Sequence, residues 1–238
     1  MNYSKEFKNY ATKHLSLNTQ LVEASMTPMI LEERELRVTQ MSVFDRMMMD
    51  RILWLYGVVD DRMASIVQAQ LLFLDSIETK DITLQISSPG GSVLSGLAII
   101  DVMNYIKSDV STINLGLCAS MGSVLLSSGT KGKRNALINS KTMIHHVSSG
   151  TEGVIDDQRI TLMETERYNF ILFKMLANNC GKTFDEIHDI SRRDKWFNSD
   201  QAKDYGFVDN IIGLDKNKSI TELMEGFDEY YEKEVLKK

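Results

Sequence analysis

Cysteine is scarce in this sequence, and its scarcity excludes two classes of protein. The 238 residues contain two cysteines, Cys118 and Cys180, and four scattered histidines. Two cysteines cannot form the framework of a disulfide-rich domain, and no cysteine or histidine spacing matches a metal site. Cys118 is interpreted as a small buried residue. We therefore expect neither a metal nor another cofactor.

Long hydrophobic runs are also missing. No apolar stretch approaches the roughly 20 residues needed to cross a bilayer, and residues 1–25 lack the apolar segment of a secretory signal. The net charge is −6, and no basic stripe with interleaved aromatic residues is present. We therefore expect a cytoplasmic protein that binds neither membranes nor nucleic acids. With 43% hydrophobic residues, the chain can bury one substantial core.

Strand-like and helix-like patterns alternate at short intervals between residues 51 and 145. This alternation predicts an α/β fold with largely parallel strands. Strands are expected at 51–57, 82–86, 110–115, 134–138 and 141–145, and helices at 60–76, 93–106 and 124–128. Residues 1–25 are interpreted as a tail or pro-segment, because they show no sustained period, and residues 29–43 as an exposed hairpin.

From residue 156 onward, the sequence pattern predicts mainly helices. A run from 156 to 179 predicts one long helix that is apolar on nearly all sides around residues 170–176, so we expect another subunit to cover it. In particular, Phe170, Ile171, Phe173 and Leu176 are predicted to be buried partly against a facing subunit. Capping patterns predict short helices after Thr183 and Asn198, the second ending at Gly206.

The octamer from Gly116 to Ser123 has the features of a nucleophile turn. Ser120 stands between a buried strand and a helix, where its hydroxyl lies beside the free N–H groups of the helix. Gly116 and Gly122 are expected to allow close approach of backbone or substrate. The alternative is an ordinary N-cap serine with small neighbours. A second turn, at Gly90 and Gly91, leaves N–H groups uncovered, as an oxyanion hole requires, or is simply a tight turn.

A serine nucleophile needs a base to remove its proton. His145 and His146 end a strand expected in the same sheet as Ser120, and because strand neighbours point to opposite faces, one of them at most faces the site. His188 is expected to be solvated in a charged helix. Asp194 is a candidate for the orienting carboxylate by position alone.

Five motifs together resemble one family, in their order and spacing. They are Ser88-Pro89-Gly90-Gly91, Ala119-Ser120-Met121-Gly122, Gly129-Thr130-Lys131-Gly132-Lys133-Arg134, Met143-Ile144-His145, and Arg193-Asp194 followed by Tyr205-Gly206-Phe207-Val208-Asp209. Over about residues 28–213 the chain resembles the proteolytic subunits of the Clp protease, the ClpP family. The resemblance implies Ser120 as nucleophile, His145 as base, Asp194 as orienting carboxylate, and the backbone N–H groups of Gly91 and Met121 as oxyanion donors.

The same resemblance implies a crotonase-like fold, with repeated strand-strand-helix units in a head domain and a protruding handle. The expected division is a pro-segment at 1–25, an axial hairpin at 26–43, the head at 44–146 and 181–213, the handle at 147–180, and a tail at 214–238. It also implies a serine endopeptidase that cleaves unfolded polypeptides inside two stacked heptameric rings. A partner AAA+ ATPase of the ClpX, ClpA or ClpC type would use the ATP. Self-cleavage is expected near Ser25-Met26.

Some residues depart from the family pattern. His146-Val147 replaces the usual Gln-Pro, and Arg192 replaces an acidic residue. At the positions of the ATPase-docking pocket, where the family often has aromatic residues, this chain has the polar residues Thr83, Gln85 and Asn135. These polar positions leave open a structural or regulatory ring subunit with weak ATPase docking. A second alternative is an acyl-CoA enzyme of the crotonase superfamily, which shares the implied fold and a glycine-based oxyanion hole but needs no serine nucleophile.

Overall fold

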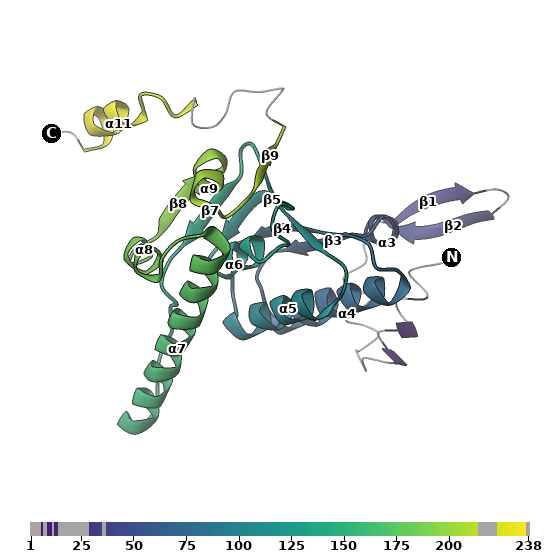
Figure 1. Cartoon of the computed structure of the whole chain (residues 1–238), viewed down its shortest axis with the longest axis horizontal. Helices are drawn as coiled ribbons and strands as arrows, with labels where there is room; N and C mark the ends of the chain where they lie inside the picture. The colour runs from purple at the N-terminus through teal and green to yellow at the C-terminus, as the bar shows by residue number, and fades with distance from the viewer. Residues whose placement is uncertain are drawn as a thin grey trace.

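A parallel sheet organises the chain, which is described here from a computed structural model (Figure 1). The structure describes residues 6, 9, 10, 12, 13, 29–34, 37–213 and 223–236. The predicted cleavage near Ser25-Met26 and most of the predicted pro-segment lie outside these residues.

Within the described residues, seven strands form the main sheet, in the order β3-β4-β5-β6-β9, with β7 beside β5 and β8 beside β7. The strands are β3 (Ile52–Tyr56), β4 (Ile82–Ser88), β5 (Val110–Ala119), β6 (Arg134–Leu137), β7 (Lys141–Ile144), β8 (Lys195–Asn198) and β9 (Asn210–Ile212). All neighbours are parallel except β7 and β8. The predicted α/β fold with largely parallel strands is therefore confirmed.

The helices are α3 (Val43–Met49), α4 (Asp61–Ile77), α5 (Val93–Tyr105), α6 (Met121–Ser127), α7 (Ile155–Cys180), α8 (Phe184–Ile190), α9 (Ser199–Tyr205) and α11 (Phe227–Tyr230), followed by the π-helix η1 (Tyr231–Val235). Helices α4 and α5 lie along one side of the sheet (Figure 1). On β3 and β4, alternate side chains are buried in the core, namely Leu53, Leu55, Leu84 and Ile86. The intervening side chains leave the other sheet face partly exposed.

Strand β5 determines where the site forms. It was expected to end near residue 115, but it continues to Ala119, and α6 begins at Met121 rather than at 124. The strand pairs with β6 through its first half and with β7 through its second half. The long strand therefore meets the helix directly at Ser120. The short strands β8 and β9 were not predicted.

Helix α7 projects from the body of the chain (Figure 1). Phe170 is 53% exposed and Ile171 is 43% exposed, as expected for residues that a second subunit would cover. Phe173 and Leu176 are each only 2% exposed, so the prediction that a facing subunit buries them is wrong. The reason is that the C-terminal half of α7 packs on α6 and α8 of its own chain.

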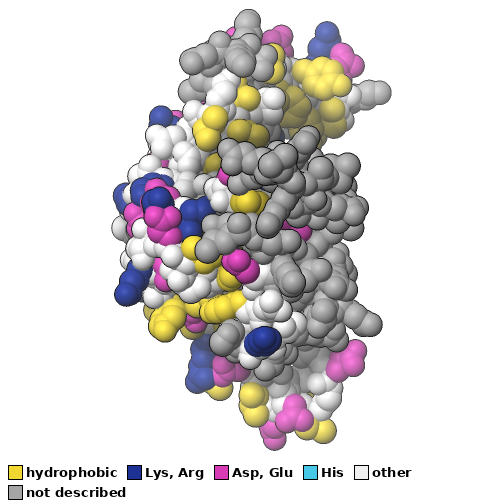
Figure 2. Space-filling model, turned by 90° about the vertical axis from the view of Figure 1, so that its right-hand side faces the viewer, with side chains coloured by type: hydrophobic (Ala, Val, Ile, Leu, Met, Phe, Trp, Pro, Cys, Tyr) yellow, Lys and Arg dark blue, Asp and Glu magenta, His cyan; other side chains and the backbone are white. Residues whose placement is uncertain are grey.

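At the opposite end, β1 (Met29–Arg34) and β2 (Arg37–Ser42) form an antiparallel hairpin, as predicted, which projects away from the sheet (Figure 1). Ser42 then caps α3 through a reciprocal pair of hydrogen bonds with Asp45. Figure 2 views the molecule from this end, and in the described part of that face apolar groups are separated by mixed positive and negative side chains. Positive charge is not gathered there into a stripe.

Candidate active site

Ser120 occupies a strained turn at the junction of β5 and α6. Its φ of 53° and ψ of −123° lie outside the ordinary regions for a residue with a side chain. Its side chain makes no capping hydrogen bond to α6, so the N-cap alternative is wrong. Instead, the Ser120 N–H donates to the carbonyl of Met143 at 2.9 Å, and the Ser123 hydroxyl donates to the Ser120 carbonyl at 2.7 Å. These bonds hold the backbone of the turn in place.

Two glycines let the β4–α5 turn approach this junction closely. A Cβ on Gly90 would lie 2.7 Å from the Cβ of Ser120, and a Cβ on Gly122 would lie 3.0 Å from the carbonyl oxygen of Ser88. The close approach expected at Gly122 is therefore confirmed. At Gly116 the nearest atom beyond the chain neighbours is the Ser87 hydroxyl oxygen, 3.8 Å away, so no described backbone approaches it closely, and approach of a substrate there stays a prediction.

The structure brings the three predicted side chains together. Strand β7 runs parallel to β5, with Met143 opposite Ala119, so His145 follows β7 where Ser120 follows β5. His145 Nε2 lies 2.9 Å from Ser120 Oγ. On the other side of the ring, His145 Nδ1 lies 3.5 Å from Asp194 Oδ1, and the Asp194 side chain is 61% exposed. The serine and histidine are in hydrogen-bond contact, whereas the carboxylate is held more loosely.

His146 points away from Ser120, as the alternation of strand residues predicted. Its ring packs against Phe173 and His188, with centroid distances of 5.0 and 5.1 Å. The His188 side chain is 39% exposed, as predicted for a histidine in a charged helix, and its ring also stacks on Phe184. The sequence offered one signal that was missed: His188 lies four residues after Phe184, on the same face of α8.

A small cavity lies beside Ser120. Its volume is about 70 Å³, and Gly91 and Met121, the predicted oxyanion donors, line it together with Ser120 and His145. Met121 is the first residue of α6, so its N–H has no carbonyl partner within the helix. Gly91 has a φ of 149°, and a Cβ there would lie 2.3 Å from the carbonyl oxygen of Val59, so the turn requires glycine. Apolar side chains complete the cavity, namely Val93, Val124, Ile144, Val147, Leu172, Phe173 and Leu176.

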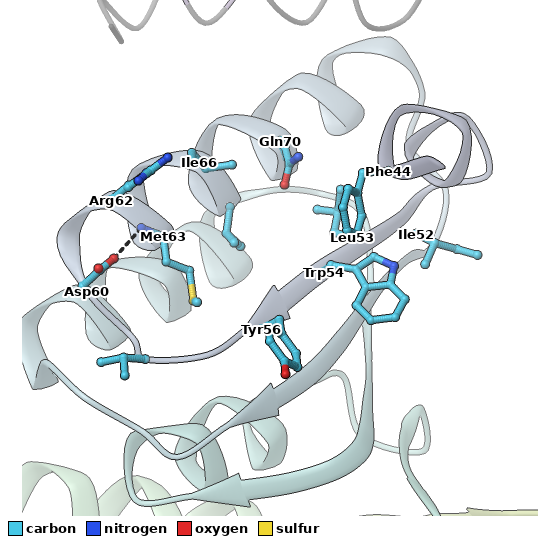
Figure 3. A pocket seen from close by; sticks show the side chains of 12 residues that line it. Phe44, Ile52, Leu53, Trp54, Tyr56, Asp60, Arg62, Met63, Ile66 and Gln70 are labelled. Atoms are coloured by element: carbon cyan, nitrogen blue, oxygen red, sulfur yellow. Dashed lines mark hydrogen bonds between the residues drawn. The ribbon is translucent and has the colours of Figure 1, made fainter. Parts of the chain in front are cut away.

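A larger cavity, of about 690 Å³, lies between β3 and α4, away from Ser120 (Figure 3). Trp54 and Tyr56 of β3 line it, together with Met63 and Ile66 of α4. β3 is an edge strand of the sheet, and Tyr56 is exposed. The alternating aromatic residues of this strand were a signal that the sequence interpretation did not use. Among the described residues no strand pairs with the outer edge of β3, so this cavity presents an apolar surface at that edge.

The three polar residues at the positions where the resemblance implies ATPase docking, Thr83, Gln85 and Asn135, lie on β4 and β6 and are partly exposed on the open face of the sheet. The strand register places Gln85 between Trp54 and Ile113, and Asn135 on the far side of Ile113. Thr83 pairs with Ile52 in the same way. Polar side chains therefore alternate with apolar ones in the row through Gln85, whereas Thr83 is followed by the polar Ser111 on β5.

The described residues contain no group of three or more histidine, cysteine or acidic side chains able to hold a metal ion. In the same part of the chain, no helix has the length and apolar character to span a membrane. Cys118 is buried, as predicted, and burial raises the pKa of its thiol well above the ordinary value. A thiol in this state is a poor nucleophile. A hydroxyl, an imidazole and a carboxylate in line are instead the arrangement that serine acyl-transfer enzymes use.

Comparison with known proteins gives the family. A family model described as Clp protease matches residues 34–215. The ATP-dependent Clp protease proteolytic subunit of Bacteroides fragilis is 46% identical over 215 residues, covering 87% of this chain and 98% of that protein. The subunit of the same name from Porphyromonas gingivalis is 45% identical over 221 residues, covering 90% of this chain and 99% of that protein. The subunit of the same name from Streptococcus agalactiae is 44% identical over 190 residues, covering 79% of this chain and 97% of that protein. The chain belongs to the Clp protease family, and its α/β fold is the ClpP fold.

Proposed function

We propose that this chain is a serine endopeptidase of a Clp system, in which Ser120 is the nucleophile, His145 the general base and Asp194 the orienting carboxylate. The observation that carries the proposal is the 2.9 Å contact between His145 Nε2 and Ser120 Oγ at a strained strand-to-helix turn. Family membership supports peptidase chemistry rather than that of an acyl-CoA enzyme.

In the proposed mechanism, neutral His145 accepts the Ser120 proton at Nε2 while the oxygen attacks the carbonyl carbon of the scissile peptide bond. Asp194 stabilises the imidazolium through Nδ1–H. The N–H groups of Gly91 and Met121 donate to the oxyanion, which they can do because they line the same small cavity. His145 then protonates the leaving amine, and a water molecule, activated by the same ring, hydrolyses the acyl-enzyme.

The proposed substrates are unfolded polypeptides, which are cleaved to short peptides. The apolar lining of the cavity beside Ser120 supports binding of an apolar side chain next to the scissile bond. This binding follows from burial of apolar surface alone, so it accommodates many sequences.

The proposal includes assembly into two stacked heptameric rings, in which 44–146 and 181–213 form the head and 147–180 forms the handle. The exposed apolar side chains of α7 and the apolar cavity at the β3 edge (Figure 3) support contacts with further copies of the chain. The names of the relatives support an ATPase partner, proposed to be of the ClpX, ClpA or ClpC type. A cytoplasmic location is supported by two buried cysteines that remain free thiols.

Replacing either histidine tests the choice of base. His145→Ala is expected to be as inactive as a variant without the serine hydroxyl, because no base then contacts Ser120 Oγ. His146→Ala is expected to keep substantial activity at pH 8, because its ring points away from the hydroxyl. Hydrolysis of a short fluorogenic peptide measures both, and the reverse ranking would show that the strand register had been misassigned.

Charged residues on the exposed part of α7 test the assembly. The double variant Phe170→Asp, Ile171→Asp is expected to give single rings or smaller species, because it places two charges where apolar surface would be buried between rings. These species are expected to be inactive. Asp194 is exposed within one chain, and we propose that the facing ring holds its carboxylate in line with His145, so loss of the ring contact would leave the triad unaligned. Analytical ultracentrifugation beside a peptidase assay measures both effects. Val235→Asp, at an exposed apolar residue in η1, is the control.

A structural or regulatory ring subunit is the second candidate, favoured by the polar residues Thr83, Gln85 and Asn135 on the open sheet face. A fluorophosphonate probe distinguishes the two functions. Stoichiometric labelling of Ser120, located by peptide mass spectrometry, supports the peptidase. An assembled particle without labelling would support the structural subunit.

A further inference from the structure

Gly91, one of the two proposed oxyanion donors, is held in place by the backbone of Val59, a fully buried residue between β3 and α4. The Val59 N–H donates to the carbonyl of Gly90 at 2.8 Å, and the Ser92 N–H donates to the carbonyl of Val59 at 2.7 Å, so Val59 and Gly91 form a short parallel bridge. The Gly90 carbonyl and the Gly91 N–H belong to one planar peptide group, in which they point in opposite directions. The bond from Val59 therefore aims the Gly91 N–H away from Val59, and Gly91 lines the cavity beside Ser120.

A side-chain hydrogen bond between two helices fixes the segment that contains Val59. Asp61 is the first residue of α4, two positions after Val59, and its Oδ1 accepts a hydrogen bond from the Ser95 hydroxyl of α5 at 2.6 Å. The Ser95 and Ser92 hydroxyl oxygens lie 2.8 Å apart, and Ser92, the N-cap of α5, directly follows Gly91. The two segments are thus joined at both ends, by the backbone bridge at one end and by the Asp61–Ser95 bond at the other.

The Asp61–Ser95 bond joins a buried group to an exposed one. Ser95 is only 4% exposed, whereas Asp61 lies at the surface. A bond of 2.6 Å from a hydroxyl to a carboxylate is of the short, charge-assisted kind. Apolar packing between α4 and α5 is not directional, so without this bond the first turn of α4 is free to shift on α5. Such a shift moves Val59, and with it the peptide group that carries the Gly91 N–H.

We propose that Asp61 and Ser95 are positioning residues for the oxyanion hole, and that their hydrogen bond holds Val59 where it aims the Gly91 N–H at the developing oxyanion. This inference rests on the proposed triad and on Gly91 as an oxyanion donor. Such a donor is worth about 10²-fold to 10³-fold in kcat, provided that it lies roughly 2.7–3.1 Å from the oxyanion. Loss of the Asp61–Ser95 bond keeps the donor but loosens its position, so we expect a part of that factor, about tenfold.

Ser95→Ala is the first test, and it is expected to lower kcat for a short fluorogenic peptide by about tenfold. KM is expected to stay nearly unchanged, because the bound peptide carries no oxyanion before the attack by Ser120. A peptide boronate, whose tetrahedral adduct with Ser120 places an oxygen in the hole, is expected to bind about tenfold more weakly. Ser65→Ala is the matched control with unchanged kcat, because its hydroxyl donates to the backbone carbonyl of Asp61 within α4 and joins no second helix. Native mass spectrometry checks that each variant assembles.

Variants of Asp61 show whether the loss acts through the hydrogen bond. Asp61→Ala is expected to lose the same factor as Ser95→Ala, and the double variant no more than either single one, because each change removes the same bond. Asp61→Asn keeps an oxygen that accepts from the Ser95 hydroxyl, so it is expected to retain its activity. Unchanged kcat in both alanine variants, additive losses in the double variant, or a loss of kcat without weaker boronate binding would overturn the proposal. Turnover by Ser120→Ala would instead overturn the proposed triad, so the two failures are distinguishable.

Discussion

Replacing Ser120 by alanine is expected to reduce peptide hydrolysis by about 10⁴-fold to 10⁶-fold. The hydroxyl oxygen is the atom that forms the acyl-enzyme, and His145 at 2.9 Å then has no group to deprotonate. The loss is expected in kcat, with binding of the peptide nearly unchanged, because the apolar cavity beside the turn is kept.

The same variant is expected to assemble normally. Alanine removes one oxygen atom from a turn held by backbone hydrogen bonds from Ser120 and Ser123. Ser65→Ala is the matched control, because its hydroxyl donates to the carbonyl of Asp61 within α4 and lies outside the site. Steady-state kinetics and native mass measurements on both variants provide the comparison. Full turnover by Ser120→Ala would refute the proposed nucleophile.

Replacing Asp209 by asparagine is expected to lower the free energy of unfolding by about 3–5 kcal/mol. Asp209 receives two hydrogen bonds from the Arg134 guanidinium, at 2.9 and 2.6 Å, and one from the N–H of Gly132. Arg134 is only 3% exposed and also donates to the carbonyl of Asn179 near the end of α7. Without the carboxylate, a positive charge is left buried and unpaired where β6, β9 and α7 meet.

The pH dependence of stability gives a second measure of this pair. Burial opposes ionisation of Asp209, but the hydrogen bonds from Arg134 outweigh it, so the pKa of this carboxyl is lowered. Ionised Asp209 therefore stabilises the fold above its unfolded pKa of about 3.9, and this stability is lost as pH falls through the lower folded pKa. Urea unfolding at pH 7 and in this acidic range is expected to show the loss in the unchanged chain and a smaller loss in Asp209→Asn.

Asp204→Asn is the matched control, because it makes the same chemical change on the exposed side of α9. Its free energy of unfolding is expected to change by no more than about 0.5 kcal/mol. An equal loss in both variants would mean that the Arg134–Asp209 pair has no special role in stability.

The sequence by itself determined the order of the main strands and helices, because hydrophobic periodicity is a local property of neighbouring residues. Local patterns also located the capping box at Thr183, the αL end of α9 at Gly206, and the turn at Ser120. The choice of Asp194 among 33 acidic residues came from family resemblance, since no local pattern distinguishes an orienting carboxylate.

Only the tertiary structure decided which of these residues meet. His145 reaches Ser120 because β7 pairs with the second half of β5, and that pairing depends on a strand four residues longer than its pattern predicted. His146 meets His188, 42 residues away in sequence, because α7 and α8 pack together beside the end of β7. The same packing buries Phe173 while Phe170 stays exposed. Such contacts between distant segments depend on strand register and helix packing, which the hydrophobic pattern of one segment cannot encode.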